Sequence, residues 1–167
     1  MAQRVQADPP LRVRGIDAKH HLTLMCRSLS EVATYAIVDD ARYRLLKAAT
    51  PGSYTFILRA TRDVPRRLLH ARRKTIGVRV PSHPVARALL EELDEPILSA
   101  TLSLPGEAVP LSDPAQIREK LEHHVDLVLD AGSCGIEPST VIDLTGEQPL
   151  VVRRGKGSLE PFAVESV

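Results

Sequence analysis

Residues 74–81 read Lys-Thr-Ile-Gly-Val-Arg-Val-Pro. Their β-branched and apolar side chains predict a strand over residues 75–80. Side chains alternate along a strand, so Arg79 is expected on the face opposite Val78 and Val80. An arginine in such a strand either reaches a ligand or closes a salt bridge with an acidic residue, and the sequence leaves both interpretations open.

Outward from this strand, strands and helices alternate along the chain. A turn at Thr50-Pro51-Gly52 precedes Tyr54-Thr55-Phe56-Ile57-Leu58, which is typical of a strand. Further strands are predicted over residues 22–26, 97–103, 125–129, 140–144 and 150–153, helices over 30–36, 40–49, 84–93 and 112–123, and one or two helical turns within 64–72. The alternation predicts a single α/β domain with a mixed sheet and flanking helices, and strands 54–58, 75–80 and 97–103 at its centre.

Composition is that of an ordinary soluble globular domain, because 43% of the 167 residues are hydrophobic and 26% are charged. Residues 1–10 are expected to form a disordered leader, residues 11–157 the domain and residues 158–167 a tail. Neither a secretory signal nor an apolar run of membrane-spanning length is seen. The two cysteines, Cys26 and Cys134, match no metal or redox spacing, and the expected compartment is the cytoplasm.

The near-neutral total charge conceals two halves of opposite sign. Residues 1–90 contain 17 Lys and Arg against 6 Asp and Glu, whereas residues 91–167 contain 5 against 15. The segment 59–79 is the most basic, and it predicts binding of a polyanion such as RNA or, as the alternative, a solvated basic face. The candidate RNA-binding residues are Arg66, Arg67, Arg72, Arg73 and Lys74.

Other polar residues give weaker indications. Ser99, Thr101 and Ser103 would share one face of the strand 97–103, where their hydroxyls suit a phosphate or a plain amphipathic strand. The histidine pairs 20–21 and 123–124 have no third ligand at metal spacing, so no metal site is expected.

Three motifs in this order resemble the YrdC-like domain family: residues 50–58, residues 74–84 and Pro138-Ser139-Thr140-Val141-Ile142-Asp143-Leu144. Arg14, followed by His20-His21-Leu22-Thr23-Leu24-Met25-Cys26, narrows the resemblance to the YciO branch. The resemblance covers residues 11–157. It implies a twisted α/β sheet with a concave basic groove.

Members of this family form threonylcarbamoyl-adenylate from threonine, bicarbonate and ATP, with release of pyrophosphate, for modification of tRNA. The resemblance therefore implies ATP with Mg²⁺, L-threonine and bicarbonate as substrates, and some members are described as binding double-stranded RNA. It places nucleotide contacts at Arg14, Thr75, Ser99, Thr101 and Arg153, and threonine contacts at Arg79 and Ser139. No side chain need act as a covalent nucleophile, so catalysis would rest on positioning and charge neutralisation.

The sequence departs from the family pattern at three places. Arg14 and Ile16 stand where the synthases have a Lys-x-Arg pair, and Thr101 replaces the asparagine of a Ser-Ala-Asn motif. Nothing before Arg12 resembles the threonine-pocket motif that opens other members, so the first strands are expected to be missing and a homodimer through an open edge is expected. Two functions remain open: a synthase-type enzyme, or a module that binds RNA or a nucleotide without turnover.

Overall fold

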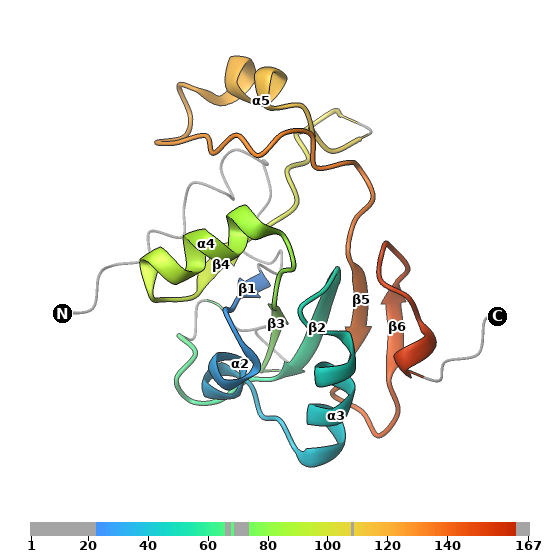
Figure 1. The fold of residues 1–167 in the computed structure, drawn as a ribbon. Coiled ribbons are helices and arrows are strands. Elements are labelled where there is room, and N and C mark those ends of the chain that lie inside the picture. Colours follow the sequence, from blue (N-terminus) through green and yellow to red (C-terminus); the bar gives the residue numbers. More distant parts are fainter. Residues whose placement is uncertain (1–22, 66–67, 69–73, 108, 163–167) are drawn as a thin grey trace. The chain divides into compact units, whose positions relative to one another are not determined.

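The computed structural model of the protein describes residues 23–65, 68, 74–107 and 109–162. The chain divides into two compact units: one comprises residues 21–99 and 137–167, and the other includes residues 100–136. All the strands named below lie in the first unit (Figure 1).

The first unit is built on one mixed sheet with the strand order β4-β1-β3-β2-β5-β6. Strands β1 and β3 pair in parallel, as do β2 and β5, and the other neighbours pair antiparallel. The strand bounds are β1 Thr23–Met25, β2 Tyr54–Arg59, β3 Thr75–Arg79, β4 Ile97–Ser99, β5 Thr140–Asp143 and β6 Leu150–Arg153. The predicted α/β fold with a mixed sheet is therefore confirmed.

The helices begin where the sequence supplies a cap or a proline. Ser28, Asp39 and Asp113 each accept a hydrogen bond from a backbone N–H of the first helical turn. Pro84 and Pro114 start their helices at the position where a missing N–H costs nothing. The helices are α2 Leu29–Tyr35, α3 Asp40–Ala49, α4 Pro84–Leu93 and α5 Pro114–Leu121, with a short 3₁₀ helix η2 at Glu160–Phe162.

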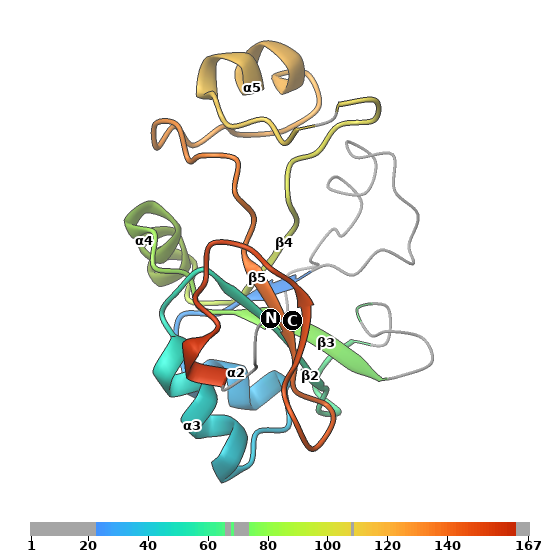
Figure 2. The same ribbon diagram turned by 90° about the vertical axis from the view of Figure 1, so that its right-hand side faces the viewer.

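One face of the sheet forms the core of the first unit. Leu24, Phe56, Val78 and Ile142 alternate with more polar neighbours and are at most 5% exposed. Helices α2 and α3 cover this face through buried residues that include Val32 and Leu46. Figure 2 shows α2 and α3 next to each other beside the strands. The polar residues between these apolar ones are left for the opposite face.

Two predicted strands are wrong. The strand predicted over 97–103 at the centre of the sheet is only Ile97–Ser99. This strand, β4, ends the strand order because β1 is its only partner among the described residues. Residues 125–129 form no strand; Leu127 is 72% exposed there. Among the described residues, no strand lies beside residues 100–103 or 125–129, so the β-favouring side chains there have no ladder to join.

Most of the helical turns predicted over 64–72 lie outside the described residues. Within the described residues, no helix has the length and apolarity needed to cross a membrane.

The two thiols differ in environment, and we expect them to differ in reactivity. Cys26 is fully buried, and burial raises the pKa of its thiol to about 12, whereas Cys134 is exposed. Because the thiolate is the reactive form, native protein at pH 8 should react with one equivalent of a disulfide reagent, and a second equivalent should react only after unfolding. The Cys134→Ser variant should show no fast reaction. Two fast equivalents in native protein would contradict the burial of Cys26.

Candidate functional site

The sheet face opposite α2 and α3 carries most of the polar side chains of the strands. On β1, alternation places Thr23 and Met25 on this face. On β3, it places Thr75, Gly77 and Arg79 there. The paired registers bring the corresponding residues of the other strands beside them. We call this surface the polar face; its hydroxyl-bearing and charged members are Thr23, Thr55, Arg59, Thr75, Arg79, Ser99, Asp143 and Arg153.

Arg79 stands at the end of β3 with a half-buried side chain. Its neighbours in the sheet are Met25 of β1 and, one step beyond the Phe56–Val78 pair, Thr55 of β2. The Nε atom of Arg79 is buried and has no hydrogen-bond partner in the described part of the chain. Burial also lowers the pKa of the guanidinium from its ordinary value. A desolvated guanidinium of this kind is suited to a carboxylate or phosphate ligand.

Ser139 and Arg153 meet on the polar face. Arg153 donates from Nε and Nη2 to the carbonyl oxygen of Ser139, at 3.2 and 2.9 Å, and from Nη2 to its hydroxyl at 3.4 Å. The hydroxyls of Ser139 and Thr55 are 3.0 Å apart. Since Thr55 lies beside Arg79, residues of four adjacent strand segments form one row of polar groups, which we call the Arg79 row: Arg79, Thr55, Ser139 and Arg153.

Thr75 and Ser99 lie on the same face, away from this row. Thr75 is 7% exposed and precedes Arg79 by four residues, about 13 Å along a strand. Ser99 lies beside Thr23, and its hydroxyl donates to the carbonyl oxygen of Thr23 at 3.1 Å. That hydroxyl therefore keeps only its acceptor capacity for a ligand.

The remaining predicted site residues either lie outside the described residues or are not part of the Arg79 row. Arg14 and the candidate RNA-binding residues Arg66, Arg67, Arg72 and Arg73 lie outside the described residues. Lys74 is exposed just before β3, with a φ of 51°. Thr101 belongs to the other compact unit, where its carbonyl oxygen accepts from the Ser103 N–H. The predicted strand face shared by Ser99, Thr101 and Ser103 is wrong, because β4 ends at Ser99.

Two residues of this region, Thr55 and Thr140, are not among the site residues predicted from the sequence. Thr55 carries the only hydroxyl on the polar-face side of the apolar stretch Tyr54–Leu58, and alternation alone could have placed it there. Thr140 is fully buried on the core face, and its role depends on segments distant in sequence. No local pattern signals that role.

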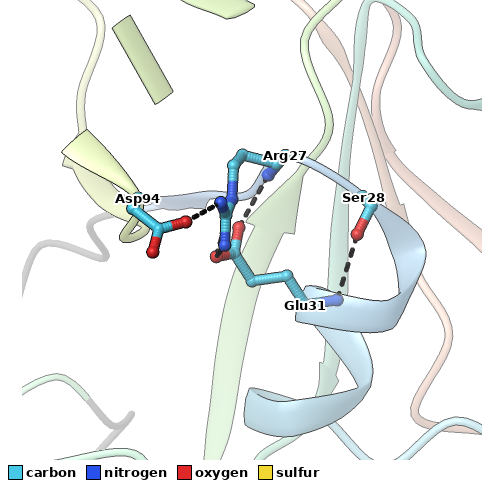
Figure 3. A network of polar contacts seen from close by, with 4 residues as sticks. All are labelled: Arg27, Ser28, Glu31 and Asp94. Atoms are coloured by element: carbon cyan, nitrogen blue, oxygen red, sulfur yellow. Dashed lines mark hydrogen bonds and ion pairs between the residues drawn. The ribbon is translucent and has the colours of Figure 1, made fainter. Parts of the chain in front are cut away.

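A second polar network, centred on Arg27, lies at the turn after β1 (Figure 3). Arg27 donates to Glu31 from its backbone N–H at 2.7 Å and from Nε and Nη2, and it also binds Asp94 at the end of α4. The single cation is shared by two carboxylates, and these contacts connect the turn after β1 to α2 and to the end of α4.

No group of three or more His, Cys, Asp or Glu side chains within the described residues could hold a metal ion. The ligand groups of the polar face are instead guanidinium and hydroxyl groups, which suit anions.

Comparisons with known proteins find a family model and relatives that are similar to this chain. A family model named for Sua5, YciO and YrdC, and described as "Telomere recombination", matches residues 11–155. The chain is 55% identical over 151 residues to YciO of Escherichia coli, covering 90% of this chain and 73% of that protein. It is 35% identical over 134 residues to a putative threonylcarbamoyl-AMP synthase of Mycobacterium tuberculosis, covering 80% of this chain and 60% of that protein.

Solved structures give the same result. The crystal structure of E. coli YciO superposes with a TM-score of 0.87 at 54% identity, covering 93% of this chain and 75% of that one. The structure of Sua5 from Pyrococcus abyssi complexed with L-threonine has a TM-score of 0.79 at 26% identity, covering 87% of this chain and 43% of that one. The family predicted from the sequence motifs is confirmed: the chain belongs to the Sua5/YciO/YrdC family and is similar to its YciO members.

Proposed function

We propose that this protein binds ATP and L-threonine on the polar face and, with bicarbonate, forms threonylcarbamoyl-AMP and pyrophosphate. The observation that carries the proposal is Arg79, a half-buried guanidinium whose Nε lacks a protein partner in the described chain. Family membership supports the choice of reaction, since relatives named threonylcarbamoyl-AMP synthase match this chain at 33–35% identity.

The reaction assigns each residue of the polar face a binding task. The Arg79 fork binds the threonine carboxylate, and the hydroxyls of Ser139 and Thr55 orient the amino acid. Arg153 neutralises phosphate charge, while Thr75 and Ser99 contact the nucleotide, whose Mg²⁺ is held mainly by phosphate oxygens. Arg14 and Thr101 are proposed as further nucleotide contacts on the strength of the family motifs alone.

The chemistry balances without a protein nucleophile. The threonine amine and bicarbonate condense to a carbamate with loss of water, and a carbamate oxygen then attacks the α-phosphorus of ATP. A P–O bond forms to the carbamate and the P–O bond to the departing pyrophosphate breaks. The protein contributes by holding the two reactants in line and by neutralising the charge that develops on the phosphates.

Pyrophosphate release is the direct test. Purified protein with MgATP, L-threonine and bicarbonate should release pyrophosphate, and omission of threonine should reduce the rate to background. Chromatography should show threonylcarbamoyl-AMP in equal amount. Release that does not depend on threonine, or no release although both ligands bind, would contradict the synthase proposal.

A binding module for RNA without turnover is the second candidate. It is favoured by the exposed cations at the ends of β2 and β3, Arg59, Arg62 and Lys74, none of which is in an ion pair with the described residues. Salt dependence separates the candidates. RNA binding whose affinity falls steeply with salt, in a protein that releases no pyrophosphate, would favour this second function.

A further inference from the structure

Residues 153–157, at and after the end of β6, form hydrogen bonds with residues 138–140, where β5 begins. We call this set of hydrogen bonds the grip. The N–H of Lys156 donates to the carbonyl oxygen of Pro138 at 2.9 Å, and Arg153 binds the carbonyl oxygen and hydroxyl of Ser139. Thr140, the next residue, contacts the same segment through its side chain, which lies on the other face of the sheet. One segment, residues 153–157, is therefore bonded to three successive residues, 138–140.

The hydroxyl of Thr140 is the centre of this grip. It is fully buried, donates to the carbonyl oxygen of Gly157 at 2.7 Å and accepts from the N–H of Gly155 at 3.1 Å. One side-chain oxygen thereby fixes two backbone groups of the segment that follows β6. Because a buried polar group is costly without partners, Thr140 ties its own stability to the position of that segment.

The two glycines permit the close approach. A Cβ at Gly155 would lie 2.2 Å from the carbonyl oxygen of Pro138 and 2.8 Å from the backbone of Ser139. A Cβ at Gly157 would lie 2.4 Å from the ring of Tyr54. Any side chain at these positions would push the segment away from Thr140. The hydrogen bonds of Thr140 therefore depend on the close packing at both glycines.

We propose that Thr140 is a positioning residue for the Arg79 row. Its side chain lies on the core face and cannot touch a ligand on the polar face, so it acts through Gly155 and Gly157. By fixing the chain on both sides of Lys156, it holds Arg153 against the carbonyl oxygen of Ser139 and keeps the Ser139 hydroxyl beside Thr55. The effect on ligand rests on the proposed function, whereas the effect on Arg153 does not.

Two substitutions separate the hydroxyl from the shape of the side chain. Thr140→Val keeps the volume and loses both hydrogen bonds, and Thr140→Ser keeps the hydroxyl. We expect Thr140→Val to raise KM for threonine about tenfold with little change in kcat. A displaced binding group weakens binding of the ground state and of the transition state equally, so the loss appears in KM. Thr140→Ser should stay within about threefold of the parent.

A measurement on the ligand-free protein tests the grip independently of any activity. The Arg153 side chain is exposed but hydrogen-bonded to Ser139, so its Nε–H should exchange with solvent faster in Thr140→Val than in the parent and in Thr140→Ser. Ile142→Val is the matched control: Ile142 is a buried residue on the same face of β5, and removing a methyl group there lowers stability without touching the grip. Its rate of Arg153 Nε–H exchange should equal that of the parent.

The outcomes are distinct. If the parent binds no threonine, the proposed function fails, and Arg153 exchange still decides the role of Thr140. Unchanged Arg153 exchange and unchanged threonine KM in a folded Thr140→Val protein would overturn the positioning role. Should that variant not fold, the Gly155 N–H of the parent decides: it should exchange as slowly as the amides of β5, and fast exchange would overturn the proposal.

Discussion

Replacement of Phe162 by alanine is expected to lower the free energy of unfolding by about 3–5 kcal/mol, the cost usual for a buried aromatic residue. Phe162 lies in η2 and is only 3% exposed. Its ring centroid lies 5.7 Å from that of Tyr54 and 6.0 Å from that of Phe56, both on β2. Removal of the Phe162 ring would therefore leave a cavity beside these two rings.

Urea unfolding followed by circular dichroism measures this effect. Leu150→Ala is the control, because Leu150 is 63% exposed and its truncation should change the unfolding free energy by less than about 0.5 kcal/mol. Phe162→Leu should fall between the two. Equal stability of Phe162→Ala and Leu150→Ala would show that η2 does not seal the core.

Replacement of Arg79 by methionine should abolish threonine binding without loss of stability. A charged hydrogen bond contributes about 1.5–3 kcal/mol, so loss of a two-pronged contact should weaken binding at least about 100-fold. Stability should be unchanged or higher, because burial disfavours the charged guanidinium and the described residues offer it no ion pair.

Calorimetry and urea unfolding on two variants decide the role of Arg79. Arg79→Lys keeps the charge without the planar fork, and its threonine affinity should drop by about 1.5–3 kcal/mol while folding changes little. If Arg79 instead closed a buried pair with an acidic residue, Arg79→Met would cost about 3–5 kcal/mol of stability. Such a loss, with threonine affinity unchanged, would end the carboxylate-binding proposal.

Local chemistry made most elements of the fold predictable. Capping residues such as Asp39, prolines such as Pro84 and the apolar alternation around Phe56 each act within a few residues of the element they define. The place of a strand in the sheet depends instead on which distant strand lies beside it. For this reason the sequence wrongly predicts a central strand over residues 97–103 and a further strand over residues 125–129.

The residues of the candidate site are likewise predictable from the sequence only in part. Arg79 stands out in sequence because a cation interrupts an apolar strand, and family motifs indicate Ser139 and Arg153. The contact between Ser139 and Thr55 joins β2 to the start of β5 and requires the folded sheet. Thr140 looks like an ordinary strand residue, since its two hydrogen-bond partners lie 15 and 17 residues further along the chain.

The parallel pairing of β2 with β5 also has a consequence for synthesis of the protein. Tyr54 of β2 lies opposite Thr140 of β5, and the aromatic cluster closes only with Phe162. On the ribosome, β2 and β3 emerge long before these partners, with one sheet edge and the apolar rings of Tyr54 and Phe56 uncovered. Such a nascent chain is a natural client for chaperones, and contacts this distant in sequence predict slow folding. Strains depleted of chaperones should therefore accumulate this protein in inclusion bodies.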